Sequence, residues 1–316
     1  MKFALLTVSY SGLFYAGKGL SLEQQIHKAK ELGFDALSIE TKRPVASPLD
    51  LDPAARLHIR DLAREEGISL CALESLSDFS SRVMESRENN LAMMQLVLRL
   101  AHDLGIGLVK VFAAWPGLVD DEEAFAQYSP YDRVPYYKRL SADDLRKWNR
   151  AVRGIREVAG WAADLGITLA LQNHAPVIRA GYEDVLAMQQ EIARDNVKLC
   201  LDVPLFQERQ DDEYIELAVR KTAGLVALTH FGAWNFSQRS NGEIVQDPSP
   251  SFGAPINYLA FFQALEQTGY PGCLVSEYCL PVIRQHQLAG MDEVDKANRI
   301  SLKYMKGLVK EFSPAL

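Results

Sequence analysis

Residues 161–172 read Trp-Ala-Ala-Asp-Leu-Gly-Ile-Thr-Leu-Ala-Leu-Gln, and this stretch joins the end of a helix to an apolar strand. The glycine follows the last helix position, where the left-handed conformation that ends a helix costs glycine little. The run that begins at Thr168 is apolar, as the strands of a parallel sheet are. Residues 28–36, Lys-Ala-Lys-Glu-Leu-Gly-Phe-Asp-Ala, repeat the same joint. The chain therefore uses one helix-to-strand unit more than once.

This unit can be traced eight times, as a short apolar or β-branched run followed by a longer segment with helical periodicity. The expected strands span residues 3–9, 36–40, 69–74, 108–112, 168–174, 197–202, 225–230 and 273–277. Further helices are expected to end at Gly67, Gly105 and Gly269. Eight alternating units predict an α/β protein with a (β/α)8 TIM barrel, whose active sites lie at the C-terminal ends of the strands. An open doubly wound sheet is the alternative, but no G-x-G-x-x-G follows the first strand.

Length and composition indicate a single domain over residues 1–316, with loop insertions near 115–140 and 236–254. A hydrophobic content of 48% excludes a disordered chain, and a net charge of −7 argues against nucleic acid as a partner. No apolar run approaches the roughly 18 residues that cross a bilayer. The first residues lack a signal peptide and the cysteines lack a pairing pattern. We therefore expect a cytoplasmic protein with reduced thiols and no membrane partner.

Polar side chains end the last four expected strands, where the barrel interior should otherwise be apolar. They are Gln172, Asp202, His230 and Glu277. Because side chains alternate along a strand, each can point inward above small or apolar neighbours. One imidazole among oxygen donors suits a single divalent ion, Mn²⁺ first and Mg²⁺, Co²⁺ or Zn²⁺ as alternatives, with positions left open to substrate.

With these motifs the chain resembles the xylose isomerase-like TIM-barrel superfamily, the sugar isomerase and epimerase group that includes D-tagatose 3-epimerase and inosose dehydratase. In that family Glu, Asp, His and Glu from the last four strands bind one divalent metal, and the enzymes move protons beside a carbonyl. The resemblance implies that Asp202, His230 and Glu277 are metal ligands. Gln172 stands where a glutamate is usual, and its amide oxygen can coordinate but adds no charge and cannot act as a base. We therefore expect weaker metal binding and a stronger Lewis acid.

The replacement of the usual glutamate by Gln172 also affects which residues can transfer protons. An epimerase that works from both faces of its substrate needs two such groups, and Gln172 removes one of the usual glutamates. His174 lies two residues further along the same expected strand, and a reference pKa of about 6.5 suits proton abstraction near neutral pH. We hypothesise that His174 is the base, with Glu277 as both ligand and second proton carrier. The alternative is that His174 only hydrogen-bonds the loop after Pro176.

Four further residues are candidates for substrate binding, and each has a structural alternative. They are Lys110, Trp115, Trp234 and Arg284. Lys110 lies within a strand, so it is either paired with Glu74 or Glu40 or faces the substrate. The two tryptophans follow the fourth and seventh strands and either stack on a sugar ring or form a rim cluster. The arginine follows the last strand and reaches either a substrate hydroxyl or a neighbouring subunit.

Together these features predict a metal-dependent enzyme that abstracts a proton next to the carbonyl of a sugar or keto-sugar, and so isomerises or epimerises it. Segments 7–12 and 42–50 also resemble the catalytic subunits of bacterial C-glycoside deglycosidases. That resemblance implies a lyase that cleaves 3-keto-C-glycosides by β-elimination and works with a small second subunit. An endonuclease IV-like metallonuclease would need more histidine ligands and a basic groove. A non-enzymatic sugar-binding barrel is the remaining alternative function. As protein partners, the chain could have a second copy of itself or a small second subunit.

Overall fold

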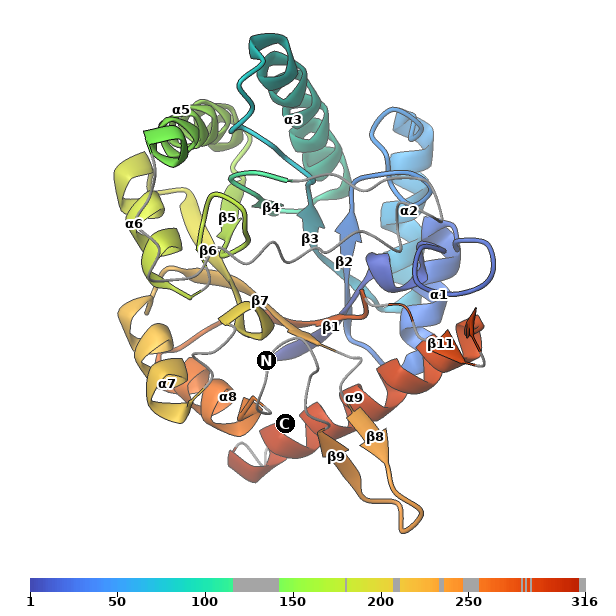
Figure 1. The fold of residues 1–316 in the computed structure, drawn as a ribbon. Coiled ribbons are helices and arrows are strands. Elements are labelled where there is room, and N and C mark those ends of the chain that lie inside the picture. Colours follow the sequence, from blue (N-terminus) through green and yellow to red (C-terminus); the bar gives the residue numbers. More distant parts are fainter. Residues whose placement is uncertain are drawn as a thin grey trace.

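A closed barrel of eight parallel strands forms the centre of the molecule (Figure 1). The computed structural model describes residues 1–115, 142–179, 181–206, 211–232, 236–246, 256–279, 281, 283–284 and 286–312. The barrel strands are β1 (Lys2–Leu6), β2 (Ala36–Glu40), β3 (Ser69–Glu74), β4 (Leu108–Val111), β5 (Thr168–Gln172), β6 (Val197–Asp202), β7 (Val226–Gly232) and β10 (Cys273–Glu277). The order around the barrel is β1-β10-β7-β6-β5-β4-β3-β2, and β1 closes the ring by pairing with both β10 and β2.

Helices follow the strands and form an outer layer around them (Figure 1). Within the described residues they are α1 (Leu22–Leu32), α2 (Pro53–Glu66), α3 (Met84–Leu104), α5 (Ala142–Asp164), α6 (Glu183–Ile192), α7 (Asp212–Lys221), α8 (Tyr258–Gln267) and α9 (Met291–Phe312). The last helix, α9, lies beside the first, α1, so the outer layer also closes (Figure 1). The predicted (β/α)8 TIM barrel is confirmed.

Local sequence determines where helices begin and end. At the start of α1, the Ser21 hydroxyl accepts a hydrogen bond from the backbone N–H of Gln24, whose side chain accepts one from the N–H of Ser21. At its end, Gly33 adopts the left-handed conformation with a φ of 86°. The predicted glycine ends are confirmed elsewhere by positive φ angles at Gly67, Gly105, Gly166 and Gly269. Each of these glycines leads the chain directly into the next strand.

Four expected strands, 36–40, 69–74, 197–202 and 273–277, match the structure residue for residue. The expected strand 3–9 is too long, because β1 ends at Leu6 and Thr7–Tyr10 form the 3-10 helix η1. There the Thr7 hydroxyl accepts a hydrogen bond from the backbone N–H of Glu40, so the hydroxyl oxygen takes the place of a backbone carbonyl in the pairing with β2. The expected strand 168–174 is also too long. It ends at Gln172 because the N–H of His174 folds back to the carbonyl of Gln172 at 2.9 Å.

The two expected insertions are described to different extents. Of the insertion at 115–140, only Trp115 falls within the described residues. The insertion at 236–254 begins with the antiparallel pair β8 (Phe236–Gln238) and β9 (Ile244–Gln246), which projects beside α9 (Figure 1). A second short antiparallel pair, β11 (Ile283–Arg284) and β12 (Gln287–Leu288), follows β10. A further 3-10 helix, η2 (Val203–Phe206), follows β6.

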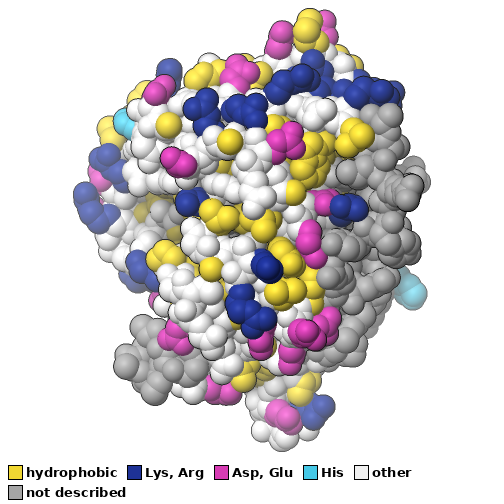
Figure 2. Space-filling model, turned by 90° about the vertical axis from the view of Figure 1, so that its left-hand side faces the viewer, with side chains coloured by type: hydrophobic (Ala, Val, Ile, Leu, Met, Phe, Trp, Pro, Cys, Tyr) yellow, Lys and Arg dark blue, Asp and Glu magenta, His cyan; other side chains and the backbone are white. Residues whose placement is uncertain are grey.

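Figure 2 shows the flank that lies on the left of Figure 1. Basic and acidic side chains both occur on its described surface, with hydrophobic side chains between them. Among the helices of the described ranges, none combines the length and the apolar composition needed to span a membrane.

Two glycines of α5 provide a matched test of how tightly this helix packs. A Cβ atom at Gly154 would lie 2.8 Å from Cδ1 of buried Phe79, whereas one at Gly160 would meet nothing within 4 Å. Gly154→Ala should therefore lower the free energy of unfolding by about 1–3 kcal/mol. Gly160→Ala should raise it by up to about 1 kcal/mol, because alanine favours the helix. Chemical denaturation measures the free energy of unfolding of both variants. Equal changes would show that the side chain of Phe79 moves aside without loss of stability.

Candidate active site

The strand register brings polar side chains together at the C-terminal ends of the barrel strands, here called the barrel mouth. Glu40 pairs in register with Glu74, Glu74 with Lys110, and Asp202 with His230. Residues in register on neighbouring strands point to the same side of a sheet, so these side chains share the barrel interior. Every barrel strand except β1 ends with or carries such a group: Glu40, Glu74, Lys110, Gln172, Asp202, His230 and Glu277.

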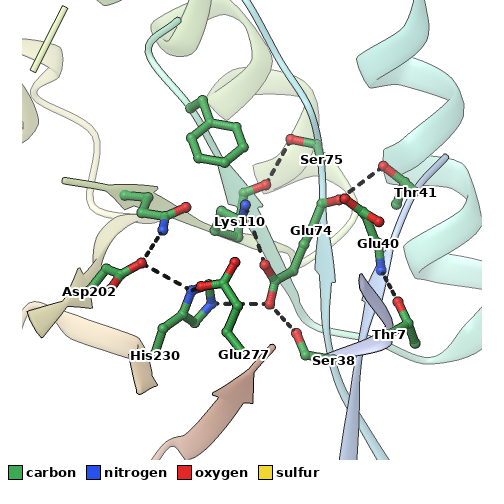
Figure 3. A network of polar contacts seen from close by, with 12 residues as sticks. Thr7, Ser38, Glu40, Thr41, Glu74, Ser75, Lys110, Asp202, His230 and Glu277 are labelled. Carbon is green, nitrogen blue, oxygen red and sulfur yellow. Dashed lines mark hydrogen bonds and ion pairs between the residues drawn. The ribbon is translucent and has the colours of Figure 1, made fainter. Parts of the chain in front are cut away.

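Four of these residues, Gln172, Asp202, His230 and Glu277, form what we call the metal group (Figure 3 labels the last three). Ligand atoms of the labelled three lie within 4.8 Å of one another. Nδ1 of His230 is 3.5 Å from Oδ2 of Asp202 and 3.3 Å from Oε2 of Glu277. The Gln172 amide donates a hydrogen bond of 2.8 Å to Oδ2 of Asp202. The structure thus brings together the four residues that were predicted as metal ligands, and their binding of a metal stays a prediction.

Three buried atoms of the metal group have no hydrogen-bond partner among the described residues. They are Oε1 of Gln172, Oδ1 of Asp202 and Nδ1 of His230. The contacts of Nδ1 with the carboxylates of Asp202 and Glu277 do not have hydrogen-bond geometry. Buried polar atoms without partners cost free energy, and native proteins contain few of them. Amide oxygen, carboxylate oxygen and imidazole nitrogen are all donors that divalent metals accept. The residues present therefore fit a divalent ion, whose charge the two carboxylates of the group would balance.

Glu74 holds His230 from the opposite side of the ring (Figure 3). Its Oε1 lies 3.2 Å from Nε2 of His230 and accepts the hydroxyl of Ser38, and its Oε2 lies 3.3 Å from Nζ of Lys110. Because an ionised carboxylate only accepts, Nε2 of His230 carries a proton. Nδ1 is the nitrogen that faces the two carboxylates of the metal group. Such an outer carboxylate orients a histidine for metal binding.

The charges of this network shift two pKa values. Burial alone would raise the pKa of Glu74, but the charges of His230 and Lys110 and the hydrogen bond from Ser38 lower it to about 2. Burial alone would lower the pKa of His230, but Glu74, Cys200 and Asp202 raise it well above its usual value. A metal ion that binds Nδ1 must therefore displace a proton, and metal affinity should fall with decreasing pH.

His174 lies beyond the end of β5, in a cluster of rings. Its ring centroid is 4.9 Å from that of Phe112 and 5.4 Å from that of Trp115. Its Nδ1 is 2.5 Å from the carbonyl oxygen of Ala175, and because a carbonyl only accepts, Nδ1 carries the proton and Nε2 keeps its lone pair. Burial, assisted by the charges of Lys110 and His230, lowers the pKa of His174 to about 4. The ring is therefore neutral at pH 7.

The four candidates for substrate binding have different outcomes. Lys110 is paired with Glu74, and its Nζ also lies 3.6 Å from the ring centroid of Phe112. Trp115 stacks on Phe112 with centroids 4.7 Å apart, so it belongs to a rim cluster that includes His174. Trp234 and the side chain of Arg284 lie outside the described residues. Contact of any of these four residues with a substrate stays a prediction.

Two residues of the barrel mouth were not among the predicted site residues. Glu40 ends β2, and its Oε1 lies 2.9 Å from Nζ of Lys42. Glu74 was expected only as a partner for Lys110, not as the group that orients His230. Both glutamates could have been found from sequence, because each ends a predicted strand as the metal-group residues do.

Residues 26–297 match the family model described as Xylose isomerase-like TIM barrel, so the chain belongs to this family. No curated protein matches the chain. The chain is thus a sugar isomerase- and epimerase-like TIM barrel with a cluster of three residues, two of them buried and one partly buried, that could hold a metal ion.

Solved structures with the same fold include sugar epimerases. A D-psicose 3-epimerase determined in the presence of D-fructose is 19% identical, with a TM-score of 0.69 over 98% of this chain and 99% of that chain. The apo form of 3-keto-D-glucoside 4-epimerase from E. coli is 16% identical, with a TM-score of 0.68 over 97% and 99%. The IOLI protein with a bound zinc atom is 16% identical, with a TM-score of 0.67 over 99% of each chain. At these identities the similarity establishes the fold alone.

Metal affinity should follow the charge of the metal group. Asp202→Ala should weaken Mn²⁺ binding by more than about 100-fold, beyond the usual cost of losing an outer partner of a ligand. Gln172→Glu should tighten it, because a carboxylate 2.8 Å from Asp202 would repel that residue until a cation binds between them. Metal titration followed by elemental analysis measures both variants.

The control for this series is Glu216→Ala, which removes an exposed carboxylate from α7 and should leave metal binding unchanged. Wild-type metal content in Asp202→Ala would contradict the assignment of Asp202. Unchanged affinity in Gln172→Glu would place Gln172 outside the ligand set.

The low pKa of His174 predicts a pH-dependent stability. Its pKa is about 4 in the folded protein against 6.5 for the free side chain, so the unfolded chain takes up the proton first as pH falls. The stabilisation is complete above pH 6.5 and is lost between pH 6.5 and pH 4. Between pH 7.5 and pH 5, metal-free wild type should lose about 2 kcal/mol more stability than His174→Asn. Equal losses in urea denaturation would show that His174 is not buried as a neutral ring.

Proposed function

We propose that this protein is a divalent-metal-dependent enzyme that abstracts a proton next to the carbonyl of a sugar or keto-sugar, and so isomerises or epimerises it. The observation that carries the proposal is the metal group, in which three buried atoms that could bind a metal have no hydrogen-bond partner among the described residues. Its place at the C-terminal ends of the barrel strands is where TIM-barrel enzymes carry their chemistry. Family membership and the structural similarity to sugar epimerases support the substrate class.

The metal group would hold the ion through Asp202, His230 and Glu277, with Oε1 of Gln172 as a neutral fourth ligand. Manganese is our first assignment, with magnesium, cobalt or zinc as alternatives. When bound, such an ion supplies Lewis acidity toward a substrate carbonyl. The protein itself keeps His230 in the required tautomer through Glu74.

His174 is our candidate for the base. The hydrogen bond from Nδ1 to the carbonyl of Ala175 leaves the lone pair on Nε2, and the rings of Phe112 and Trp115 restrict the imidazole. Its low pKa keeps it in the base form at pH 7, and also makes it a weak base that requires an acidified substrate C–H bond. Glu277 would be the second proton carrier, and its side chain is the most exposed of the metal group's titratable residues.

A lyase that expels a β leaving group, such as one that cleaves 3-keto-C-glycosides, shares this first step. Gln172 supports this lyase reaction as the second candidate function, because an amide at this position cannot transfer a proton near neutral pH. A single dominant base suits elimination, whereas epimerisation needs proton transfer on both faces of the substrate. A homo-oligomer or a small second subunit is compatible with either reaction.

A metallonuclease receives little support from the positions of the histidines. His27, His58 and His102 lie on the outer helices α1, α2 and α3 with exposed side chains. Only His174 and His230, of the six in the chain, are buried near the barrel mouth. The histidines therefore do not supply the additional ligands that a metallonuclease would need. We keep a small sugar as the proposed substrate, and the candidates for binding it are Lys110, Trp115, Trp234 and Arg284.

His174→Ala should abolish turnover while keeping the fold and the bound metal, because the ring does not belong to the metal group. Loss of a general base costs about 100- to 10,000-fold in rate. The measurement is incorporation of solvent deuterium next to the carbonyl of D-fructose, D-tagatose and D-psicose, with metal content determined on the same samples. Exchange at the wild-type rate would exclude His174 as the base. Exchange that survives on one face alone would favour an epimerase that uses Glu277.

A further inference from the structure

A second charged pair lies across the barrel mouth from the metal group. Glu40 stands at the end of β2, and in the ring of eight strands β2 lies opposite β6, which carries Asp202. Glu40 points into the barrel because it is in register with Glu74. Its side chain is 7% exposed and that of Lys42 is 18% exposed, and Oε1 of Glu40 lies 2.9 Å from Nζ of Lys42.

The two glutamates of this side of the mouth differ in how their oxygens are satisfied. Glu74 contacts three donors, the side chains of Ser38, Lys110 and His230. Glu40 contacts Lys42 alone through Oε1, and its buried Oε2 has no hydrogen-bond partner among the described residues. Nζ of Lys42 is buried as well and makes no contact with hydrogen-bond geometry within that part of the chain. A purely structural ion pair would be satisfied as Glu74 is. Oε2 of Glu40 and the N–H donors that the Lys42 ammonium has beyond its ion-pair contact with Glu40 therefore point to a ligand.

The chemistry of these two groups selects the ligand. Oε2 of Glu40 accepts a hydrogen bond and Nζ of Lys42 donates one, and both atoms belong to the same ion pair. A hydroxyl group can donate to the carboxylate while its neighbour on the same molecule accepts from the ammonium. Two adjacent hydroxyl groups of a sugar match this pair, whereas a phosphate would be repelled by the carboxylate.

The charge of the whole mouth leads to the same ligand. Among the described side chains, the carboxylates are Glu40, Glu74, Asp202 and Glu277, and the lysines are Lys42 and Lys110. The two lysines balance two of these four carboxylates, and a divalent ion in the metal group would balance the other two. Among these described side chains, no surplus positive charge then remains to bind a phosphate dianion.

We propose that Lys42 and Glu40 form a hydroxyl-binding subsite that holds two adjacent hydroxyl groups of an unphosphorylated sugar, on the side of the mouth opposite the metal group. This inference rests on the proposed function, because it concerns the substrate of the same site. It assigns a role in substrate recognition to the end of β2, which the metal and proton-transfer chemistry does not use.

The test compares Mn²⁺-loaded wild type with Glu40→Gln and Lys42→Met by isothermal titration calorimetry. The probes are D-fructose, D-tagatose, D-psicose and D-fructose 6-phosphate. Each variant should bind the unphosphorylated sugars about 10- to 100-fold more weakly, the effect expected when a hydrogen bond to a charged group is lost. Mn²⁺ affinity should stay close to the wild-type value, because neither residue belongs to the metal group, and the thermal unfolding midpoint is measured on the same samples to show that each variant is folded at the temperature of the titration. Two independent variants keep the test valid if one of them folds poorly.

Glu66→Gln is the matched control, because Glu66 forms an ion pair of 2.6 Å with Lys30 on the outside of the barrel. It should bind sugars as wild type does. Wild-type sugar affinity in both Glu40→Gln and Lys42→Met would overturn the subsite and leave the proposed function standing. Failure of wild type to bind any of the three unphosphorylated sugars would overturn both. Tighter binding of D-fructose 6-phosphate than of D-fructose by wild type would overturn the assignment to an unphosphorylated sugar.

Discussion

The barrel mouth depends on one buried carboxylate, that of Glu74. Its side chain is only 2% exposed, so its charge is stable there only because neighbours supply opposite charge and hydrogen-bond donors. Ser38 from β2, Lys110 from β4 and His230 from β7 meet this demand, and Glu74 itself lies on β3. Breaking such a buried pair typically costs about 3–5 kcal/mol, because the remaining charge is left uncompensated. One side chain therefore couples four strands and sets the electrostatics of the site.

The arrangement around Glu74 divides the mouth into two sides with different properties. On the β2–β4 side, carboxylates and lysines form ion pairs. On the β5–β10 side, donor atoms of Gln172, Asp202 and His230 are left without hydrogen-bond partners within the described residues. His230 belongs to both sides, because one ring nitrogen faces Glu74 and the other faces the metal group. Glu74 on one side thus keeps a proton on Nε2 of His230 and leaves Nδ1 as the nitrogen that faces the candidate metal ligands on the other.

The sequence patterns predict the barrel and the metal group for the same reason, since both depend on where strands end. Glycines at helix ends precede most of the strands, and polar residues at the strand ends identify the candidate ligands. The strands predicted at residues 3–9 and 168–174 are longer than the observed strands. The hydrophobic pattern does not show that a hydroxyl group ends the pairing in the first case and a turn in the second. The role of Glu74 could not be predicted, because its partner His230 is 156 positions away and meets it only across the closed barrel. Local sequence identifies strand-end residues, but not which of them face each other.

Gln172 is best understood through the charge of the complete mouth. Its amide donates to Asp202, so this carboxylate is held in place by the protein itself, and the amide oxygen has no hydrogen-bond partner in the described part of the chain. A glutamate at this position would place two carboxylates against each other and add a negative charge that neither Lys42 nor Lys110 could offset, since each is already paired. Repulsion of this kind disfavours ionisation of one partner and makes the geometry depend on the cation. With glutamine, Asp202 is positioned without a cation, and the described side chains of the mouth carry one negative charge fewer than they would with glutamate. A divalent ion in the metal group would then balance the charges of these described side chains, which is the electrostatic environment that suits the uncharged substrate we propose.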